Sequence, residues 1–209
     1  TMSRSRAAIS ATSATASFDL SGWQLEGVSF TFPPGSVLRP AGFMVVAADL
    51  VAFRNTYGST VVPIGVFGGN LQNNGERLRL VQPGATPSED RVIDDLRYDS
   101  ELPWPVVTRG LGPSLQLIDP LQDNRRPANW TAEPVDAPLL ATPGSANSRR
   151  ATLEPFPTVW LNEVLPANLD GLRDRAGDRD PWVELHNASD AVVDLSGLFL
   201  SSSVSNLTA

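Results

Sequence analysis

The sequence predicts an all-β fold, a sandwich or a barrel built from many short strands. Pro and Gly together number 18 + 16 = 34 of the 209 residues, which is a turn-rich composition. Between these turn residues the apolar residues come in short runs, and several runs alternate with polar residues at the period of two expected for a half-buried strand. Short strands bounded by turn signals at this spacing are typical of sandwiches and barrels.

Two strand signals precede residue 50. Residues 29–32 alternate in polarity and run into the turn cluster Pro33-Pro34-Gly35. Residues 43–47 form a continuous apolar run, which is typical of a strand that is buried on both faces.

An Asn-Gly pair gives the strongest hairpin signal. Asn73-Asn74-Gly75 lies between Leu71 and the alternating Leu78 and Leu80. Asn and Gly both tolerate the positive φ of a tight hairpin turn, so we predict that the runs on either side pair as a hairpin. Further strands are predicted at residues 92–98, 114–118, 159–165 and 182–185.

An eight-residue segment occurs twice. Residues 18–25, Phe-Asp-Leu-Ser-Gly-Trp-Gln-Leu, recur as residues 193–200, Val-Asp-Leu-Ser-Gly-Leu-Phe-Leu, at a displacement of 194 − 19 = 175 residues. Self-similarity of this kind indicates a repeated module. Between the two copies we interpret the pattern as β throughout.

A proline-rich stretch marks a boundary between two parts of the chain. Residues 131–158 contain Gly144 and five prolines, a composition typical of a semi-rigid linker. We therefore predict a first sandwich over residues 1–147, a linker over residues 148–158 and the truncated start of a second, similar module over residues 159–209. We interpret both ends of the sequence as cuts made in a longer protein.

Short motifs cover residues 8–147 in a consistent order and spacing. They are Asp19–Trp23, Phe30–Gly35, Gly42–Ala47, Phe53–Gly58, Leu71–Glu76, Trp104-Pro105, Gly112–Leu117, Asn129-Trp130 and Thr142–Asn147. Together they resemble the lamin-tail domain in its bacterial extracellular form. Residues 161–164 and 182–187 resemble the first two strands of that family, so a second copy is expected to start there.

The resemblance implies an immunoglobulin-like antiparallel β-sandwich. It also implies that the first copy lacks its first strand and that its second strand is reduced to about residues 7–9. Bacterial modules that look like this sit in large exported proteins beside other β-sandwich domains, kinase-like domains, nucleases or phosphoesterases. The resemblance therefore implies an accessory or adhesive role, and it supplies no catalytic residues.

Composition narrows the function classes. The formal charge is −7, the pI is about 4.7 and all 16 basic residues are Arg, so an acidic surface disfavours nucleic-acid binding. Without Cys there are no disulfides, thiolate zinc sites or thiol nucleophiles. The only histidine, His186, ends a predicted strand, so a Ser-His-Asp triad is not expected. The apolar runs are shorter than the ~20 residues of a membrane-spanning helix, so no membrane insertion is expected.

One acidic cluster is a candidate calcium site, because Ca²⁺ prefers several oxygen ligands on a flexible loop. Its members are Asp170, Asp174, Asp178, Asp180 and Glu184. The spacing does not match an EF-hand, and interleaved arginines are expected to pair with the carboxylates: Arg173, Arg175 and Arg179. The alternative is a solvated acidic loop. Any calcium binding is expected to be weak, and we expect no other cofactor.

Three further groups are interpreted as structural. Asp94 and Asp95 are adjacent on a predicted strand and should point to opposite faces, so they do not form an acid–base pair. The five Trp occupy motif or strand positions and are assigned to core or edge packing. Asn162 and Glu163 are assigned to a structural pair at the sandwich edge.

These observations favour a non-catalytic interaction, adhesion or scaffold module of a secreted bacterial multidomain protein. Its expected location is extracellular or at the cell surface, and its expected partners are protein, glycan or a neighbouring domain of the same chain. The alternative is an accessory domain that orients a hydrolase or kinase-like catalytic domain outside this fragment. Nucleic-acid binding, as in nuclear lamin tails, is opposed by the charge.

The missing first strand leads to a docking prediction. A sandwich that lacks an edge strand exposes unpaired backbone groups, which recruit another strand. The linker after residue 147 reaches ~35 Å at ~3.3 Å per residue, enough to return along one sandwich. We predict that residues 159–165, together with 182–186, pair with the first module. The competing outcome is an independent C-terminal segment.

Overall fold

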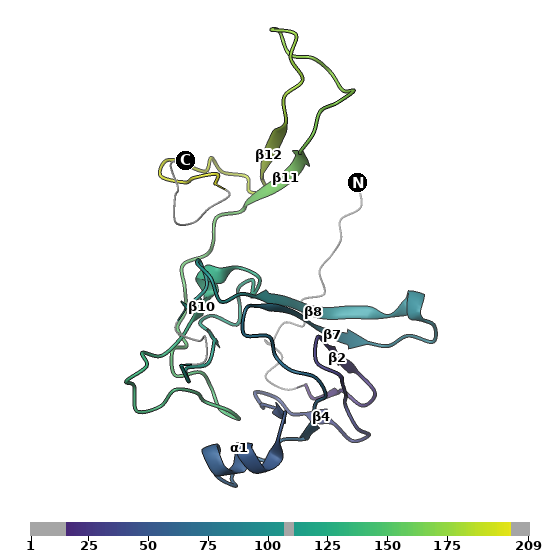
Figure 1. Cartoon of the computed structure of the whole chain (residues 1–209), viewed down its shortest axis with the longest axis vertical. Coiled ribbons are helices and arrows are strands. Elements are labelled where there is room, and N and C mark those ends of the chain that lie inside the picture. The colour runs from purple at the N-terminus through teal and green to yellow at the C-terminus, as the bar shows by residue number, and fades with distance from the viewer. Residues whose placement is uncertain (1–15, 107–110, 202–209) are drawn as a thin grey trace. The chain divides into compact units, whose positions relative to one another are not determined.

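The computed structural model describes residues 16–106 and 111–201 of the chain (Figure 1). The chain divides into two compact units, Thr1–Leu153 and Glu154–Ala209. The division falls inside the predicted linker. The remnant strand predicted at residues 7–9 lies outside the described residues.

Short strands make up most of the regular structure, which confirms the all-β fold class. Among its described residues unit 1 also contains the α-helix α1 (Leu50–Tyr57) and short 3₁₀ turns at Pro87–Glu89 and Pro127–Asn129. The strands of unit 1 are β1 (Phe18–Asp19), β2 (Gln24–Glu26), β3 (Phe30–Thr31), β4 (Val37–Leu38), β5 (Val46–Ala47), β6 (Gly65–Val66), β7 (Glu76–Gln82), β8 (Arg91–Tyr98), β9 (Gln116–Leu117) and β10 (Trp130–Thr131). Unit 2 has β11 (Val159–Leu165) and β12 (Trp182–Asn187).

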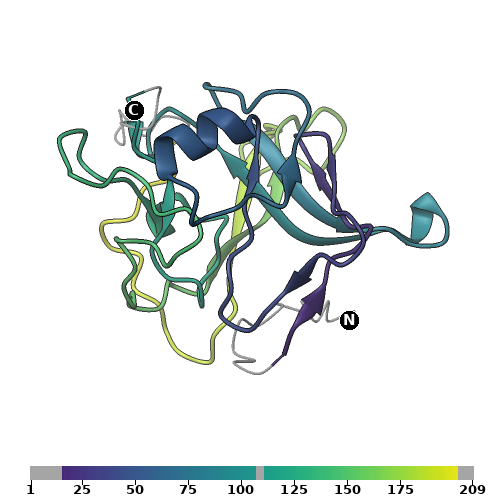
Figure 2. The same ribbon diagram turned by 90° about the horizontal axis from the view of Figure 1, so that it is seen from below.

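The main sheet of unit 1 has four antiparallel strands in the order β3-β2-β7-β8. Figures 1 and 2 show the β7–β8 hairpin extending beyond the other strands of this sheet, with the 3₁₀ turn Pro87–Glu89 near its tip. β1 pairs with β4 and β9 with β10, both antiparallel, whereas β5 and β6 are parallel. The buried apolar side chains are Leu20, Val28, Phe32, Ala47, Val81 and Trp104.

The helix α1 overturns the interpretation of the interval between the two copies as β throughout. Asp49 caps its start, because one carboxylate oxygen accepts the backbone N–H groups of Val51 and Ala52 at 2.7 and 2.9 Å. Gly58 ends it with φ of 80° and donates its N–H to the carbonyl of Arg54. Asp and Gly at this spacing are the usual start and stop signals of a helix, so the sequence itself marks both ends of α1.

Two strand predictions before residue 80 are wrong. Residues 43–47 are not buried as one strand, because only Val46 and Ala47 are paired and Phe43 is 53% exposed. The turn at residues 73–75 exists, with Gly75 at φ 103°, but it does not join paired strands. It leads into β7, which pairs with β2 and β8 instead of the run around Leu71.

The two strands of unit 2 pair with each other. β11 and β12 form a two-stranded antiparallel sheet with a register irregularity between Leu161 and Glu163. The sheet contains these two strands alone among the described residues, and the docking of residues 159–165 and 182–186 onto the first module stays a prediction. The residue bounds predicted for β11 are confirmed.

The first part of the predicted linker belongs to unit 1. The N–H of Ala151 donates to the carbonyl of Ile118 at 3.0 Å, and the N–H of Leu153 donates to Asp119 Oδ2 at 3.0 Å. The hydroxyl of Ser148 lies 3.0 Å from Gln116 Oε1. These bonds hold residues 148–153 against β9, so the chain leaves unit 1 only after Leu153.

Candidate functional site

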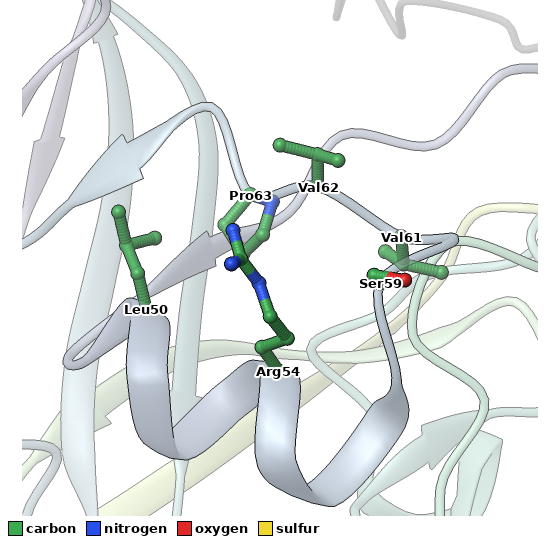
Figure 3. Close-up of a pocket in the computed structure, with 6 residues that line it drawn as sticks. All are labelled: Leu50, Arg54, Ser59, Val61, Val62 and Pro63. Carbon is green, nitrogen blue, oxygen red and sulfur yellow. The ribbon is translucent and has the colours of Figure 1, made fainter.

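A small hollow lies beside α1 in unit 1 (Figure 3). Its volume is about 40 Å³, roughly the space of one or two waters. Leu50 and Arg54 come from α1, and the Arg54 side chain extends toward Pro63 on the following segment. The rim is mixed, because Arg54 and Ser59 line it beside the apolar residues, and it is open, since Val62 is 75% exposed. A space of this size does not enclose a substrate, so we do not assign a ligand to it.

A larger hollow of about 390 Å³ lies in unit 2 at the acidic loop between β11 and β12. Three of the predicted calcium ligands line it: Asp174, Asp178 and Asp180. Asp170 and Glu184 do not. Across the described residues, no group of three or more potential ligands is close enough to hold a metal ion together. The calcium site therefore stays a prediction, with three of its five carboxylates at one hollow.

Hydrogen bonds occupy two of the same carboxylates, those of Asp174 and Glu184. Asp174 Oδ1 accepts the N–H groups of Ala176 and Asp178 at 2.8 and 2.9 Å. Arg173 and Arg179 donate to the backbone carbonyls of Gly177 and Gly171. The loop is thus held by bonds from side chains to the backbone, instead of by the Arg–carboxylate pairing expected from the sequence. Glu184 accepts the side-chain amide of Asn162 on the neighbouring strand, so Asn162 pairs with Glu184 and not with Glu163.

Unit 2 exposes its apolar side chains. None of residues 154–201 is buried, although the strand pattern of β11 and β12 is that of a core-facing hairpin. Leu161 is 61% exposed, and its partner in the register, Leu185, is 47% exposed. A two-stranded hairpin of this kind is marginally stable in water and gains stability by covering its apolar face. Residues 154–201 carry three Arg and nine acidic residues, which gives them a net charge of −6, whereas the whole chain has a net charge of −7.

The repeated segment adopts the same turn in both units. The N–H of Ser21 donates to Asp19 Oδ1 at 2.9 Å, and the N–H of Ser196 donates to Asp194 Oδ1 at 2.8 Å. The glycine that follows has φ of 78° in the first copy and 79° in the second. The serine hydrogen bonds hold the pKa of Asp19 and of Asp194 below the usual value for a carboxyl group. Both copies therefore specify one local geometry through Asp, Ser and Gly.

The two copies of this turn differ in how far their side chains are buried. Leu20 is 6% exposed, and Leu195, at the equivalent position, is 43% exposed. Leu198 and Leu200, which correspond to Trp23 and Leu25, are 59% and 64% exposed. The turn in unit 2 thus has the same local geometry with more exposed leucines than the turn in unit 1.

The adjacent carboxylates of β8 have separate structural partners. Asp95 accepts two hydrogen bonds from the guanidinium of Arg77, at 2.8 and 2.5 Å. Asp94 accepts the side-chain amide of Asn124 at 3.0 and 2.9 Å. The hydrogen bond from Arg77 lowers the pKa of Asp95 despite partial burial of the carboxyl group. These different partners agree with the assignment of Asp94 and Asp95 to opposite faces.

The Arg77–Asp95 pair gives a prediction for pH dependence. A lowered pKa in the folded state means that the ionised carboxylate stabilises unit 1 above about pH 4. This contribution is lost as the pH falls through the lowered pKa of Asp95. Because the Arg77 side chain is 60% exposed, we expect Asp95→Asn to cost about 0.5–1 kcal/mol at pH 7. Urea unfolding at pH 7 and pH 2.5 measures this, and an equal loss at both pH values would contradict it.

The tryptophans divide between the units. In unit 1 Trp104 is 6% exposed and packs on Trp130 with ring centroids 5.9 Å apart. The indole N–H of Trp130 donates to the carbonyl of Asn124 at 2.7 Å. In unit 2 Trp160 and Trp182 are 41% and 42% exposed. Packing in the core is therefore confirmed for Trp104, whereas Trp160 and Trp182 belong to the exposed hairpin together with His186.

Comparison of the chain with protein-family models, with curated proteins and with solved structures found no match. The resemblance to the lamin-tail domain therefore stays a prediction. Among the residues that the structure describes, no helix has the length and apolar character needed to cross a membrane.

Proposed function

We propose that the chain is a non-catalytic interaction module of a secreted, multidomain bacterial protein, and that unit 2 carries the binding surface. The exposed β11–β12 hairpin is the observation that supports this proposal. Its cross-strand pair Leu161 and Leu185 offers apolar contact area, and its outer backbone edges offer hydrogen bonds to an added strand. The partner is a protein, a glycan or a neighbouring domain of the same chain, at the cell surface or outside the cell.

The negative charge of unit 2 favours partners with a basic surface. Residues 154–201 carry a net charge of −6, so they repel nucleic acid and acidic surfaces and attract basic ones. Among protein partners, those with exposed arginines or lysines are favoured. Calcium binding at the acidic loop is a minor part of the proposal, because three carboxylates at one hollow support weak binding at most.

A pull-down with the full chain tests the proposed surface. The immobilised chain is incubated with bacterial cell-wall and culture-supernatant fractions, beside the double variant Leu161→Ser/Leu185→Ser. We expect the variant to lose about tenfold in bound material, since each leucine contributes apolar burial at an interface. Leu121→Ser/Leu139→Ser is the matched control, because these leucines of unit 1 are 68% and 54% exposed. Binding no stronger than that of an unrelated acidic sandwich would contradict the proposal.

The alternative is an accessory domain that orients a hydrolase or kinase-like catalytic domain outside this sequence. The extended segment after Leu153, with Pro155 and Pro157, favours it as a semi-rigid spacer between domains. Reading the coding sequence on both sides of the chain distinguishes the two functions. A neighbouring catalytic domain whose activity changes when this chain is deleted would favour the accessory role.

A further inference from the structure

Residues 148–153, which we call the strap, join the body of unit 1 to the linker. At the linker end of the strap, the N–H of Leu153 donates to Asp119 Oδ2 at 3.0 Å. The carbonyl of Leu153 accepts the side-chain amide of Gln122 at 2.9 Å. Both partners belong to the turn that follows β9, so the strap is fastened to unit 1 at the point where the chain leaves it.

The start of the strap lies against a buried polar side chain. Ser148 Oγ donates to Glu133 Oε1 at 2.6 Å, and the N–H of Arg149 donates to Gln116 Oε1 at 3.2 Å. Gln116 is 1% exposed, and its Nε2 has no hydrogen-bond partner among the described residues. A buried donor without an acceptor costs free energy. Lifting the strap admits water to this amide, so the closed strap carries a cost that the open strap avoids.

The strap itself buries little apolar surface. Residues 148–152 are exposed, and within the strap only Leu153 is half-buried. The strap is therefore held by hydrogen bonds rather than by apolar packing, in contrast to β7, where Val81 is 3% exposed. Each hydrogen bond makes a modest net contribution, because water replaces it when the strap lifts. Segments with few buried apolar contacts open locally while the rest of the domain stays folded.

We propose that the strap is a reversible fastener, which detaches while unit 1 stays folded and thereby changes the length of the linker. With the strap closed, residues 154–158 alone span the linker and reach about 17 Å at ~3.3 Å per residue. With the strap open, residues 148–158 reach about 35 Å. The effective concentration of a tethered site depends on linker length, so the strap sets how strongly binding sites on either side of the linker act together. This device belongs to unit 1 and the linker, and it does not depend on the binding surface proposed for unit 2.

Hydrogen exchange of the full chain, followed by amide NMR, tests whether the strap opens by itself. The amides of Ala151 and Leu153 are both hydrogen-bonded to unit 1, and we expect them to exchange at least about a hundredfold faster than those of β7. Low urea concentrations should leave the strap rates unchanged and raise the β7 rates, because only global unfolding exposes much surface. Exchange of the strap and of β7 at one rate, with the same urea dependence, would overturn the proposal.

A pair of proline variants tests which bonds close the strap. Leu153→Pro removes the N–H that bonds Asp119, and it should raise the exchange rate of the Ala151 amide about tenfold or more, because a hydrogen bond to a charged carboxylate is lost. Thr152→Pro is the matched control, since the N–H of Thr152 donates to no acceptor in the part of the chain that the structure describes. We expect it to change this rate less than about twofold. Equal effects of the two prolines would contradict the proposal, because the bond to Asp119 would then not hold the strap.

Energy transfer between two dyes tests whether opening lengthens the linker. The chain contains no Cys, so Leu121→Cys and Thr158→Cys place one dye on unit 1 and one beyond the linker without competing labels. Adding Leu153→Pro should shift the distances between the dyes to larger values, whereas adding Thr152→Pro should not. Unchanged distances in a Leu153→Pro chain whose strap amides exchange faster would overturn the proposal, since the strap would then open without extending the linker.

Discussion

Asn129→Ala is expected to destabilise unit 1 by about 3 kcal/mol. The Asn129 side chain is fully buried at 0% exposure, and its amide bonds both backbone groups of Asp119. Its Oδ1 accepts the N–H of Asp119 at 2.8 Å, and its Nδ2 donates to the carbonyl of Asp119 at 2.9 Å. Truncation leaves these two backbone groups unpaired in a buried site, at about 1–3 kcal/mol each.

The loss of stability should extend beyond the site of Asn129, because Asp119 also binds two other backbone groups. Its carboxylate accepts the N–H groups of Leu121 and Leu153, at 2.9 and 3.0 Å, and the bond from Leu153 is the main cause of its lowered pKa. Asn129 thus fixes Asp119, which lies two residues after the end of β9 and holds the start of the linker. Loss of the amide should loosen residues 148–153 as well as the β9–β10 pair.

Asn124→Ala is the matched control for Asn129→Ala. Asn124 also uses its side-chain amide, to bond Asp94, but that bond is exposed and water replaces it. We expect its cost to stay under about 1 kcal/mol. Urea unfolding of the full chain, followed by tryptophan fluorescence, compares the two variants. Similar midpoints for both would show that the amide of Asn129 is not essential to unit 1.

Local patterns explain which parts of the fold could be predicted. The strands at residues 92–98 and 159–165 were predictable because β-branched, aromatic and leucine residues cluster there between clear turn signals. The repeat was also predictable to the level of a turn, because Asp, Ser and Gly impose that geometry without tertiary contacts.

Long-range pairing explains what could not be predicted. The run around Leu71 looks like the first strand of a hairpin, yet β7 pairs with β2, which is about 50 residues earlier in the sequence, and with β8. No local rule selects those partners. The role of Asn129 was equally hidden, because a buried Asn has the same sequence signal as a loop Asn. The helix α1, by contrast, had readable caps at Asp49 and Gly58.

The candidate site was predicted only in part for a similar reason. Acidic residues on one loop were recognisable, but which of them share a hollow depends on the path of the loop between β11 and β12. The exposure of the apolar residues in unit 2 could not be predicted, because their alternating strand pattern predicts burial. Residues such as Leu161 and Leu185 have the sequence signature of a core, and only the structure shows that both are exposed on a two-stranded sheet.

Leu20→Ala is expected to cost about 3 kcal/mol, whereas Leu195→Ala at the equivalent position should cost less than about 0.5 kcal/mol. Both leucines sit second in an Asp-Leu-Ser-Gly turn of the same geometry, so backbone and propensity effects cancel in the comparison. What differs is burial, at 6% for Leu20 and 43% for Leu195. The difference in unfolding free energy therefore measures what the burial of Leu20 contributes to unit 1.

Urea unfolding of the two single variants and of Leu20→Ala/Leu195→Ala measures that difference, and the double variant should equal the sum because the two sites belong to separate units. A cost for Leu195→Ala as large as that for Leu20→Ala would show that the second turn is packed in solution as tightly as the first, and it would contradict the prediction.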